Sequence, residues 1–559
     1  HGPQDPLGPI PCYRLFEASD GRYLFIACGN STVWGTFAIA IKRPELVSDP
    51  RFEGAPWGIA QEHWQPLKDI LEPIIRTKRC DEWLSILRDN DVPCAAVTTR
   101  AEFIDDPQVR ALSMRAELDD SSLGRTVQMG LPVTLNDTPG EITGPAPPAT
   151  DDARGFAEIR PVRNPDSRPP ARDTSRGPLA GAVVLDFASY IAGSYGPMIL
   201  AQLGADVIKI ESLAGDSFRA FGFGFLGWNQ GKRALAVDFT TPEGRDIVLG
   251  LAEKADVLVE NLRPGRMQRY GFDYPTLAAR NPRIIYMSVN AFGNRGPQHN
   301  QPGFDPLLQA RSGVMAAQGG PHAPPVYLTC AICDYGAAML SALGCVLALN
   351  ARDRTGRGQL CETSLLQASI AFQAGEFAFY DGRPDMENGG AESRGRSALA
   401  RAYQCRDGEW LFVSLSESGQ WTALRGMFAS LPARTFADAA QEPSEGKLAA
   451  ALAEEFARLA RADALDALAR AGVPATRVNH FHDLFEDPQV AANELIAEFN
   501  HAQWGKVRQT GTLANFSATP PRVDRAAPLL GEHTDEILGQ LLGYHAAQIA
   551  NLRAACVVK

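Results

Sequence analysis

The chain has 559 residues, of which 45% are hydrophobic and 21% charged, and its length predicts several domains. Its 54 basic and 65 acidic residues give a formal net charge of −11, which disfavours nucleic acid or an anionic membrane as the main partner. No run of about 18 apolar residues is evident, so we expect no membrane span. Ten cysteines without a disulfide-like spacing favour reduced thiols in a cytoplasmic protein.

Three short motifs near the N-terminus recur in the same order about 380 residues later. The pairs are SDGRYLF and RDGEWLF (19–25 and 406–412), DVPCAAV and GVPATRV (91–97 and 472–478), and IDDPQVRA and FEDPQVAA (104–111 and 485–492). The shared order and nearly constant spacing predict a duplicated α+β unit. The alternative is that turns of the DPQV type recur by chance.

Between the two copies lies a segment that we expect to be a linker. Residues 139–178 contain nine prolines, many charges and few large apolar side chains. Because proline fixes φ and lacks an N–H donor, this composition predicts an extended connection and no packed element.

After the linker, short apolar strands alternate with helices. The clearest strands are AVVLDFA (182–188), DVIKIE (206–211), DVLVEN (256–261) and RIIYMSV (283–289). This alternation predicts an α/β fold with a doubly wound parallel sheet, in which ligands bind beyond the carboxyl ends of the strands. The absence of GxGxxG, GxxxxGK[ST], HExxH and GxSxG disfavours nicotinamide enzymes, nucleotide hydrolases, metallopeptidases and serine hydrolases.

Asp334 follows a loop rich in glycine and proline and precedes a long apolar helix. A carboxylate at this place caps the helix, an interaction that contributes about 1 kcal/mol to stability. A loop carboxylate can also act as a covalent nucleophile. From the position alone, both roles are open.

Six segments from residue 185 onward carry a common family pattern in the same order. They are LDFASYIAGSYGPMILAQLGADVIKIE (185–211), NQGKRALAVDF (229–239), EGRDIVLGLAEKADVLVENLRPGRMQRYGFDY (243–274), GFDPLLQARSG (303–313), DRTGRGQLCETSLLQASI (353–370) and GEHTDEILGQLLGY (531–544). Together they resemble the class III CoA-transferase family of the CaiB–BaiF type. The resemblance implies a large Rossmann-like domain with a smaller α+β domain, coenzyme A entering as acyl-CoA, and no metal.

The resemblance also implies an enzyme that transfers CoA from an acyl-CoA donor to a carboxylic acid acceptor. Asp334 matches the family's nucleophile, which passes through an aspartyl anhydride and an aspartyl-CoA thioester. Asp305 matches an acidic position that assists near the nucleophile, although it can equally order its own loop.

Five further positions are candidates for contacts with CoA. VENLRPG resembles the family's adenine-side loop, so we expect Asn261 and Leu262 there, with Arg269 one turn further on the next helix. Lys232 and Arg233 in NQGKRAL are candidates for the CoA phosphates, since cations suit the pyrophosphate and 3′-phosphate. The alternative for this pair is a solvated loop.

Two other functions are weighed against transfer. An α-methylacyl-CoA racemase needs two bases, and its GHD motif supplies a histidine where this chain has Phe304 in GFD. A phenyl ring cannot carry a proton, so racemisation is disfavoured. A noncatalytic CoA-binding protein is the remaining alternative, and the intact Asp334 region disfavours it.

The domain expectation combines the repeat with the resemblance. We expect a small-domain copy (1–135), a Pro-rich linker (136–178), a large CoA-binding domain (179–385), a small domain (386–515) and a C-terminal helix that returns to the large domain (516–559). This organisation suggests a tandem-duplicated member seen without its first N-terminal half. It predicts either an interlocked homodimer or an intramolecular pseudo-dimer.

Overall fold

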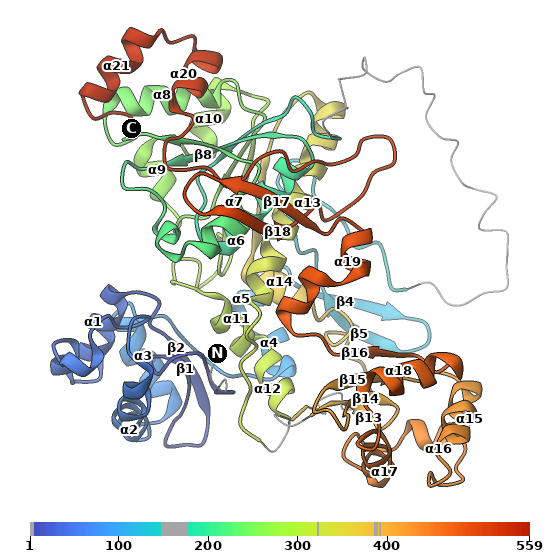
Figure 1. Ribbon diagram of the computed structural model, residues 1–559. Helices are drawn as coiled ribbons and strands as arrows, with labels where there is room; N and C mark the ends of the chain where they lie inside the picture. The colour runs from blue at the N-terminus through green and yellow to red at the C-terminus, as the bar shows by residue number, and fades with distance from the viewer. Residues whose placement is uncertain (1–4, 147–176, 321–322, 385–388, 391–392) are drawn as a thin grey trace. The chain divides into compact units, whose positions relative to one another are not determined.

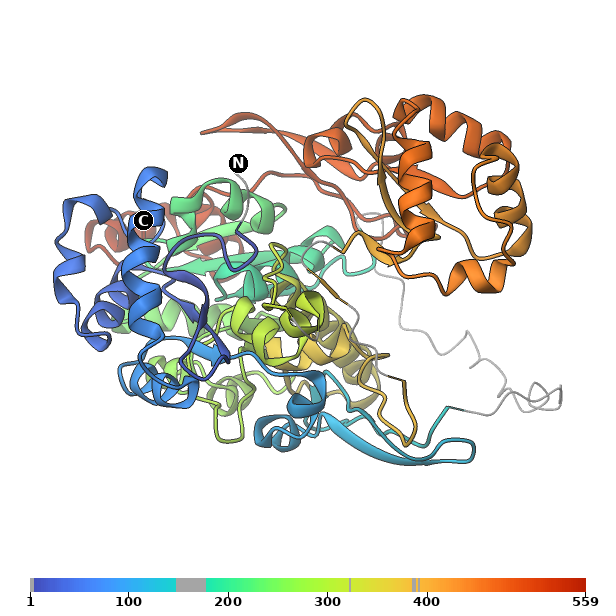
Figure 2. The ribbon, with the colours of Figure 1, turned by 90° about the horizontal axis from the view of Figure 1, so that it is seen from below.

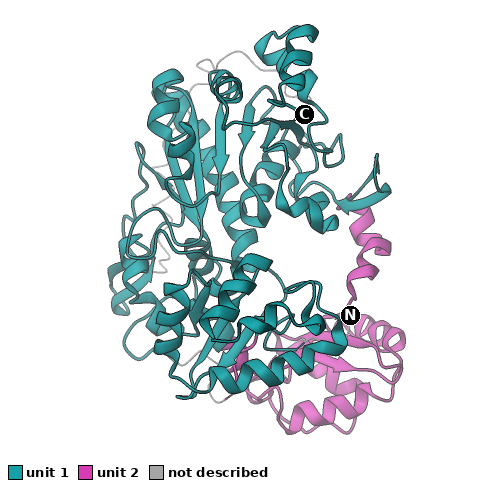
Figure 3. Ribbon diagram, turned by 90° about the vertical axis from the view of Figure 1, so that its left-hand side faces the viewer, with its two compact units in different colours: residues 1–316, 327–384, 496–559 teal, residues 317–326, 385–495 magenta. Residues whose placement is uncertain are grey.

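The computed structural model describes residues 5–146, 177–320, 323–384, 389–390 and 393–559. Contacts divide the chain into two units (Figure 3): unit 1 is formed by residues 1–316, 327–384 and 496–559, and unit 2 by residues 317–326 and 385–495. Most of the predicted linker, residues 147–176, lies outside the described residues.

A seven-stranded sheet with the order β6-β12-β11-β10-β7-β8-β9 forms the centre of unit 1 (Figure 1). Its strands are β6 (Thr134–Leu135), β7 (Val183–Asp186), β8 (Asp206–Glu211), β9 (Arg233–Ala236), β10 (Val257–Glu260), β11 (Ile285–Asn290) and β12 (Leu360–Ser364). All neighbouring pairs from β12 to β9 are parallel, and β6 joins β12 antiparallel. Counted from β7, the parallel strands have the order 3-2-1-4-5-6, which confirms the predicted doubly wound sheet.

Helices connect these strands and bury their apolar side chains. They are α6 (Tyr190–Gln202), η6 (Ser217–Phe221), α7 (Phe223–Asn229), α8 (Pro242–Ala252), α9 (Arg266–Tyr270), α10 (Tyr274–Arg280), α11 (Asp305–Arg311), α12 (Val314–Gly319), α13 (Ile332–Thr355) and α14 (Leu365–Ala371). The start of α8 shows why the sequence folds locally: the Thr241 side chain accepts from the Gly244 N–H, and Pro242 occupies the first turn. The sheet and these helices are called the large domain below.

Helix α13 is long and apolar enough to cross a membrane by length and composition alone, which the sequence analysis did not anticipate. Half of its most apolar window is buried in the fold. It packs closely on α6, where a Cβ at Gly196 would come within 2.2 Å of Ser341 Oγ and 2.8 Å of Ala338 O. Small side chains at this crossing let the two helices approach, as in the core of a folded domain.

The N-terminal segment, residues 5–135, contains a three-stranded antiparallel sheet, a hairpin and surrounding helices. Its strands are β1 (Tyr13–Glu17), β2 (Tyr23–Ala27), β3 (Cys94–Ala96), β4 (Arg115–Asp120) and β5 (Gly124–Met129), in addition to β6. Its helices are α1 (Ser31–Ala40), η1 (Pro44–Val47), η2 (Pro50–Phe52), η3 (Gln61–His63), α2 (Trp64–Ile75), α3 (Cys80–Asp89), α4 (Arg100–Ile104) and α5 (Pro107–Ala111).

The N-terminal segment is docked on the large domain within unit 1 (Figures 1 and 2). Gln108 of α5 is fully buried, and its Nε2 donates to Phe292 O and Arg295 O at 2.6 Å each. Its Oε1 accepts from Gln298 N at 2.8 Å. One glutamine side chain therefore satisfies three backbone groups of the loop that follows β11.

Unit 2 contains an antiparallel sheet with the order β13-β14-β15-β16. Its elements are β13 (Gly395–Ser397), β14 (Ala400–Gln404), β15 (Trp410–Ser414), α15 (Ser418–Met427), α16 (Phe436–Ala440), α17 (Lys447–Phe456), α18 (Arg461–Arg470), β16 (Ala475–Arg477), η7 (Phe481–Glu486) and α19 (Pro488–Ala492). The repeated motifs lie on matching elements in the two segments: SDGRYLF and RDGEWLF enter β2 and β15, and the DPQV motifs form α5 and α19. The predicted duplication stays a prediction, and this shared element order is what it would produce.

The remaining C-terminal elements belong to unit 1. They are β17 (Ile496–His501), β18 (Gly505–Thr510), α20 (Thr534–Leu542) and α21 (Ala546–Ala554). The boundary of unit 2 therefore falls at residue 495, earlier than the expected 515. Ile537 and Ile549 are buried beside the large sheet, and Val558 forms a bridge with Val237.

Gln108 and its repeat counterpart Gln489 offer a matched test of the docking. We expect Gln108→Ala to destabilise the N-terminal segment by about 1–3 kcal/mol, because it leaves buried backbone groups unpaired. Gln489 is exposed, so Gln489→Ala should change stability little. Hydrogen exchange of α4 and α5 in both variants measures the effect, and equal protection would contradict it.

Candidate active site

A cleft of about 700 Å³ opens at the carboxyl ends of β7, β10 and β11. The large domain contributes side chains from the loops after these strands, among them Tyr190, Asn261 and Ala291, together with Asp334. The strands β7 and β10 are neighbours at the point where the strand order reverses, which is where doubly wound sheets bind ligands.

The N-terminal segment lines the same cleft, which the sequence analysis did not anticipate. Asn30, Val33, Asp91 and Pro93 contribute to it. Asp91 and Pro93 belong to the repeated motif DVPCAAV, and Asn30 follows SDGRYLF by five residues. Nothing in the local sequence predicts contact with a loop about 170 residues away.

The structure brings the two predicted catalytic carboxylates together. Asp334 lies in the first turn of α13 and lines the cleft, and Asp305 is the first residue of α11. Asp305 Oδ2 accepts from the N–H groups of Cys333 at 2.7 Å and Asp334 at 3.2 Å. Its Oδ1 accepts from Gln309 Nε2. Asp305 therefore caps α13 and holds the backbone of Asp334 in place.

The proximity of these carboxylates changes their acidity. Burial raises the pKa of Asp334 well above its usual value, and the charge of Asp305 raises it further. Burial raises the pKa of Asp305 to about 6, although hydrogen bonds from Asp334 N–H, Gln309 and Cys333 N–H oppose that rise. Asp305 is buried and Asp334 is partly buried, and two carboxyls this close cannot both ionise without an electrostatic cost. The pair therefore favours states in which one carboxyl is neutral.

Asn261 and Leu262 lie where the resemblance predicted, at the edge of the cleft. Asn261 Oδ1 accepts from Ser189 N at 2.9 Å, and its Nδ2 donates to Ser189 O at 2.6 Å. The amide thus joins the loop after β10 to the loop after β7. Gly193 passes so close that a Cβ would lie 2.6 Å from this amide, which explains the glycine. The contact of Asn261 and Leu262 with CoA stays a prediction.

Two arginines other than Arg269 line the cleft. Arg269 is exposed on α9 and is not among the cleft-lining residues, whereas Arg263 and Arg266 are. Arg263 forms an ion pair with Asp91 at 3.3 Å, which connects the large domain to the N-terminal segment. The VENLRPGR motif contains both arginines, but only the fold of the loop shows which guanidinium groups reach the cleft.

Lys232 is placed differently from the expectation, and its role as a phosphate contact is corrected. The side chain is fully buried, and Nζ donates to Asp186 Oδ2 at 2.7 Å, Ser194 O at 2.7 Å and Asn229 Oδ1 at 2.8 Å. These bonds use all three ammonium protons, so none remains for a phosphate. Lys232 instead stabilises the segment that leads from β7 into α6.

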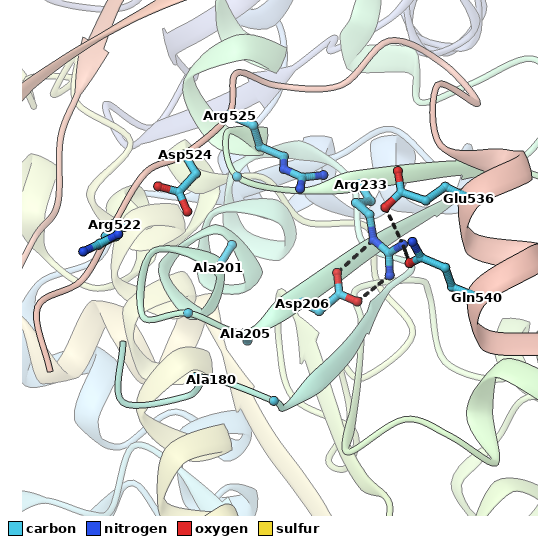
Figure 4. A pocket seen from close by; sticks show the side chains of 13 residues that line it. Ala180, Ala201, Ala205, Asp206, Arg233, Arg522, Asp524, Arg525, Glu536 and Gln540 are labelled. Atoms are coloured by element: carbon cyan, nitrogen blue, oxygen red, sulfur yellow. Dashed lines mark hydrogen bonds and ion pairs between the residues drawn. The ribbon is translucent and has the colours of Figure 1, made fainter. Parts of the chain in front are cut away.

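Arg233 is corrected for a similar reason. It lines a separate cavity of about 410 Å³ (Figure 4), which contains neither Asp334 nor Asn261. Its guanidinium forms ion pairs with Asp206 and with Glu536, the latter at 3.1 Å, and donates to Gln540 at 3.1 Å. These partners hold Arg233 between β8 and α20, away from the cleft.

Comparisons with known proteins point to one family. The sequence profile of CoA-transferase family III matches residues 1–153 and 179–534. The succinyl-CoA–L-malate CoA-transferase alpha subunit of Chloroflexus aurantiacus is 28% identical over 78% of this chain and 98% of its own length. The succinate–glutarate CoA-transferase of Agrobacterium fabrum is 31% identical over 65% of this chain and 96% of its own. A crystal structure of a CAIB/BAIF family protein from Brucella suis aligns over 66% of this chain and 100% of its own, with a TM-score of 0.59 and 30% identity.

The two arginines of α9 test which side of the helix faces a ligand. We expect Arg266→Ala to weaken the binding of free coenzyme A about tenfold, because it removes a cation that lines the cleft. Arg269→Ala, three residues later on the exposed surface, should leave the Kd unchanged. Titration calorimetry with coenzyme A measures both, and a larger effect at Arg269 would contradict the placement.

Proposed function

Because the chain belongs to CoA-transferase family III, we propose that it transfers CoA through covalent intermediates on Asp334. The chain is an enzyme of this class, and its relatives support transfer between an acyl-CoA and a carboxylic acid. The observation that carries the finer proposal is the position of Asp334, a carboxylate lining the cleft at the start of a helix that Asp305 holds in place.

The proposed reaction consists of two matched half-reactions. The Asp334 carboxylate attacks the acyl carbonyl, the C–S bond breaks, and CoA departs as the thiolate. The acyl group is then bound to Asp334 as a mixed anhydride. The thiolate then attacks the Asp334 carbonyl, which releases the donor acid and leaves an aspartyl-CoA thioester. The acceptor carboxylate reverses both steps: it displaces thiolate to form a second anhydride, and thiolate attacks the acceptor carbonyl. The new acyl-CoA leaves and Asp334 is regenerated, with no water, ATP or net proton consumed.

Asp305 supports this chemistry through its charge and its hydrogen bonds. Ionised Asp334 beside Asp305 is a poorly solvated carboxylate, and poor solvation favours attack on a carbonyl. Conversion to an anhydride or thioester makes Asp334 neutral, so the repulsion from Asp305 is relieved in both intermediates. The hydrogen bonds from the Cys333 and Asp334 N–H groups to Asp305 hold the first turn of α13 in place while these states exchange.

The position of the N-terminal segment favours a pseudo-dimer formed within one chain. The alternative is a site that two separate chains form together. Asn30 and Asp91 line the same cleft as Asp334, and Asp91 pairs with Arg263. One chain therefore supplies both sides of this cleft. A family-length chain of about 380 residues, without the N-terminal segment, would not supply the side formed here by Asn30 and Asp91.

Phe304 favours transfer over racemisation. Its ring lies beside Gly29, where an added Cβ would come within 3.2 Å of the ring. The centroids of the Phe304 and Tyr190 rings are 6.2 Å apart. No proton can be moved at this position, so a second base is missing where a racemase would need one.

Trapping of the anhydride or thioester tests the nucleophile. We expect incubation with succinyl-CoA and hydroxylamine to leave a hydroxamate on Asp334, detected by peptide mass spectrometry. Asp334→Ala should lower transfer about 10³-fold or more and retain coenzyme A binding. An unmodified Asp334 peptide across several acyl-CoAs, or modification of another residue, would sink the proposal.

The pH dependence tests the coupling of the two carboxylates. Attack requires ionised Asp334, and its pKa is raised, so kcat/KM should rise with pH through that raised pKa. Asp305→Asn removes the repulsive charge, which lowers the pKa of Asp334 and moves this acidic limb to lower pH. Asp91→Asn removes a carboxylate elsewhere in the cleft and should leave the acidic limb of the kcat/KM profile in place. The coupling is refuted if Asp305→Asn leaves the limb in place.

A further inference from the structure

We propose that the acyl group transferred at Asp334 is apolar and aromatic, and that it packs against a row of aromatic side chains beside the cleft. The inference rests on the proposed function, because it concerns the substrate of the same site. The row, called the aromatic row below, is formed by Phe304, Tyr190, Phe218, Phe221, Trp57 and Tyr13.

The aromatic row is continuous from the cleft outward. Tyr190 and Phe304 line the cleft together with Asp334. Ring centroids are separated by 6.2 Å for Phe304 and Tyr190, 4.9 Å for Tyr190 and Phe218, 4.9 Å for Phe218 and Phe221, 6.4 Å for Phe221 and Trp57, and 5.2 Å for Trp57 and Tyr13. These separations are those of packed aromatic pairs. Tyr13, at the other end of the row, is also close enough to the two carboxylates to feel them: burial raises its pKa most, and Tyr327, Asp305 and Asp334 raise it further.

Several rings of the row are open to solvent. Tyr190 and Phe221 are each 38% exposed, and Trp57 is 43% exposed. Adjacent exposed aromatic rings are unfavourable in water in proportion to their apolar area, and such patches mark ligand sites. Here the patch adjoins the nucleophile, so the ligand that covers it is the acyl part of the substrate.

The rings are held in fixed positions. Trp57 Nε1 donates to Gly29 O at 2.9 Å, and Gly29 in turn contacts the Phe304 ring. Tyr190 has φ +59°, a left-handed conformation that is rare for a residue with a side chain. Strain of this kind persists where surrounding structure imposes it, and it gathers at ligand sites. A rigid row favours flat, apolar groups over flexible charged chains.

The surroundings of Asp334 disfavour a second carboxylate on the substrate. A buried carboxylate needs a cationic partner, most often arginine. Among the described residues, burial and Asp305 alone shift the pKa of Asp334, and no cationic side chain opposes them. The described cleft-lining residues that can carry positive charge are Arg263, Arg266 and His299, and Arg263 already pairs with Asp91. The names of the relatives above specify dicarboxylates. Under this proposal, the acyl group that this chain transfers differs from theirs.

A donor panel with the full chain tests the proposal. With propionate as the common acceptor, we expect benzoyl-CoA and phenylacetyl-CoA to give kcat/KM values at least about tenfold above that of succinyl-CoA. Succinyl-CoA equal to or better than both aryl donors would overturn the inference.

Variants of the row separate substrate contact from a structural role. Trp57→Ala and Phe221→Leu should each lower kcat/KM for phenylacetyl-CoA about tenfold more than they lower kcat/KM for acetyl-CoA. Phe223→Ala is the matched control, because Phe223 is 82% exposed, lies two residues from Phe221 and is outside the row. Equal losses with acetyl-CoA and phenylacetyl-CoA, or no loss with either, would overturn the inference.

Hydroxamate trapping distinguishes the two possible failures. If no acyl-CoA modifies Asp334, the proposed function fails and this inference fails with it. If succinyl-CoA modifies Asp334 and is the preferred donor, and both row variants behave as the wild type, the inference alone fails.

Discussion

The carboxylate of Asp305 connects the two helices on which the site depends. It lies at the start of α11 and accepts the backbone N–H groups of Cys333 and Asp334 at the start of α13. The free N–H groups of a helix terminus favour a carboxylate, which offsets part of the cost of burying this one. The same placement brings a second carboxyl close to the first. Asp334 is therefore held in position by the group that makes its ionisation unfavourable.

This arrangement suits a residue that alternates between charged and neutral states. A carboxylate held far from other charges and open to water would gain nothing electrostatically from acylation. In the proposed reaction, Asp334 would lose the repulsion from Asp305 each time it became an anhydride or a thioester. Helix α13, which carries Asp334, is also packed closely on α6 through Gly196.

The cleft itself depends on segments that are far apart in the chain. Gln108 docks the N-terminal segment on the loop after β11, and Asp91 meets Arg263 at the edge of the cleft. Trp57 and Phe221 come from these two parts and contact each other in the aromatic row. The proposed catalytic carboxylates belong to the large domain alone, whereas the side chains that line the cleft come from both parts.

Local sequence determined the features that depend on neighbouring residues. Short apolar runs alternating with helices predicted the parallel sheet, and the family motifs identified Asp334, Asn261 and Leu262, which line the cleft, and Asp305, which bonds the backbone of Asp334. Only the tertiary structure decided which charged groups are free. Lys232 and Arg233 are adjacent in one motif, yet they have different partners. Lys232 forms an ion pair with Asp186 in the core, and Arg233 forms ion pairs with Asp206 and Glu536 at another cavity. The choice among Arg263, Arg266 and Arg269, and the contribution of the N-terminal segment, were likewise decided by the fold. The physical reason is that a side chain's partners come from elements brought together by long-range packing, which a local pattern does not encode.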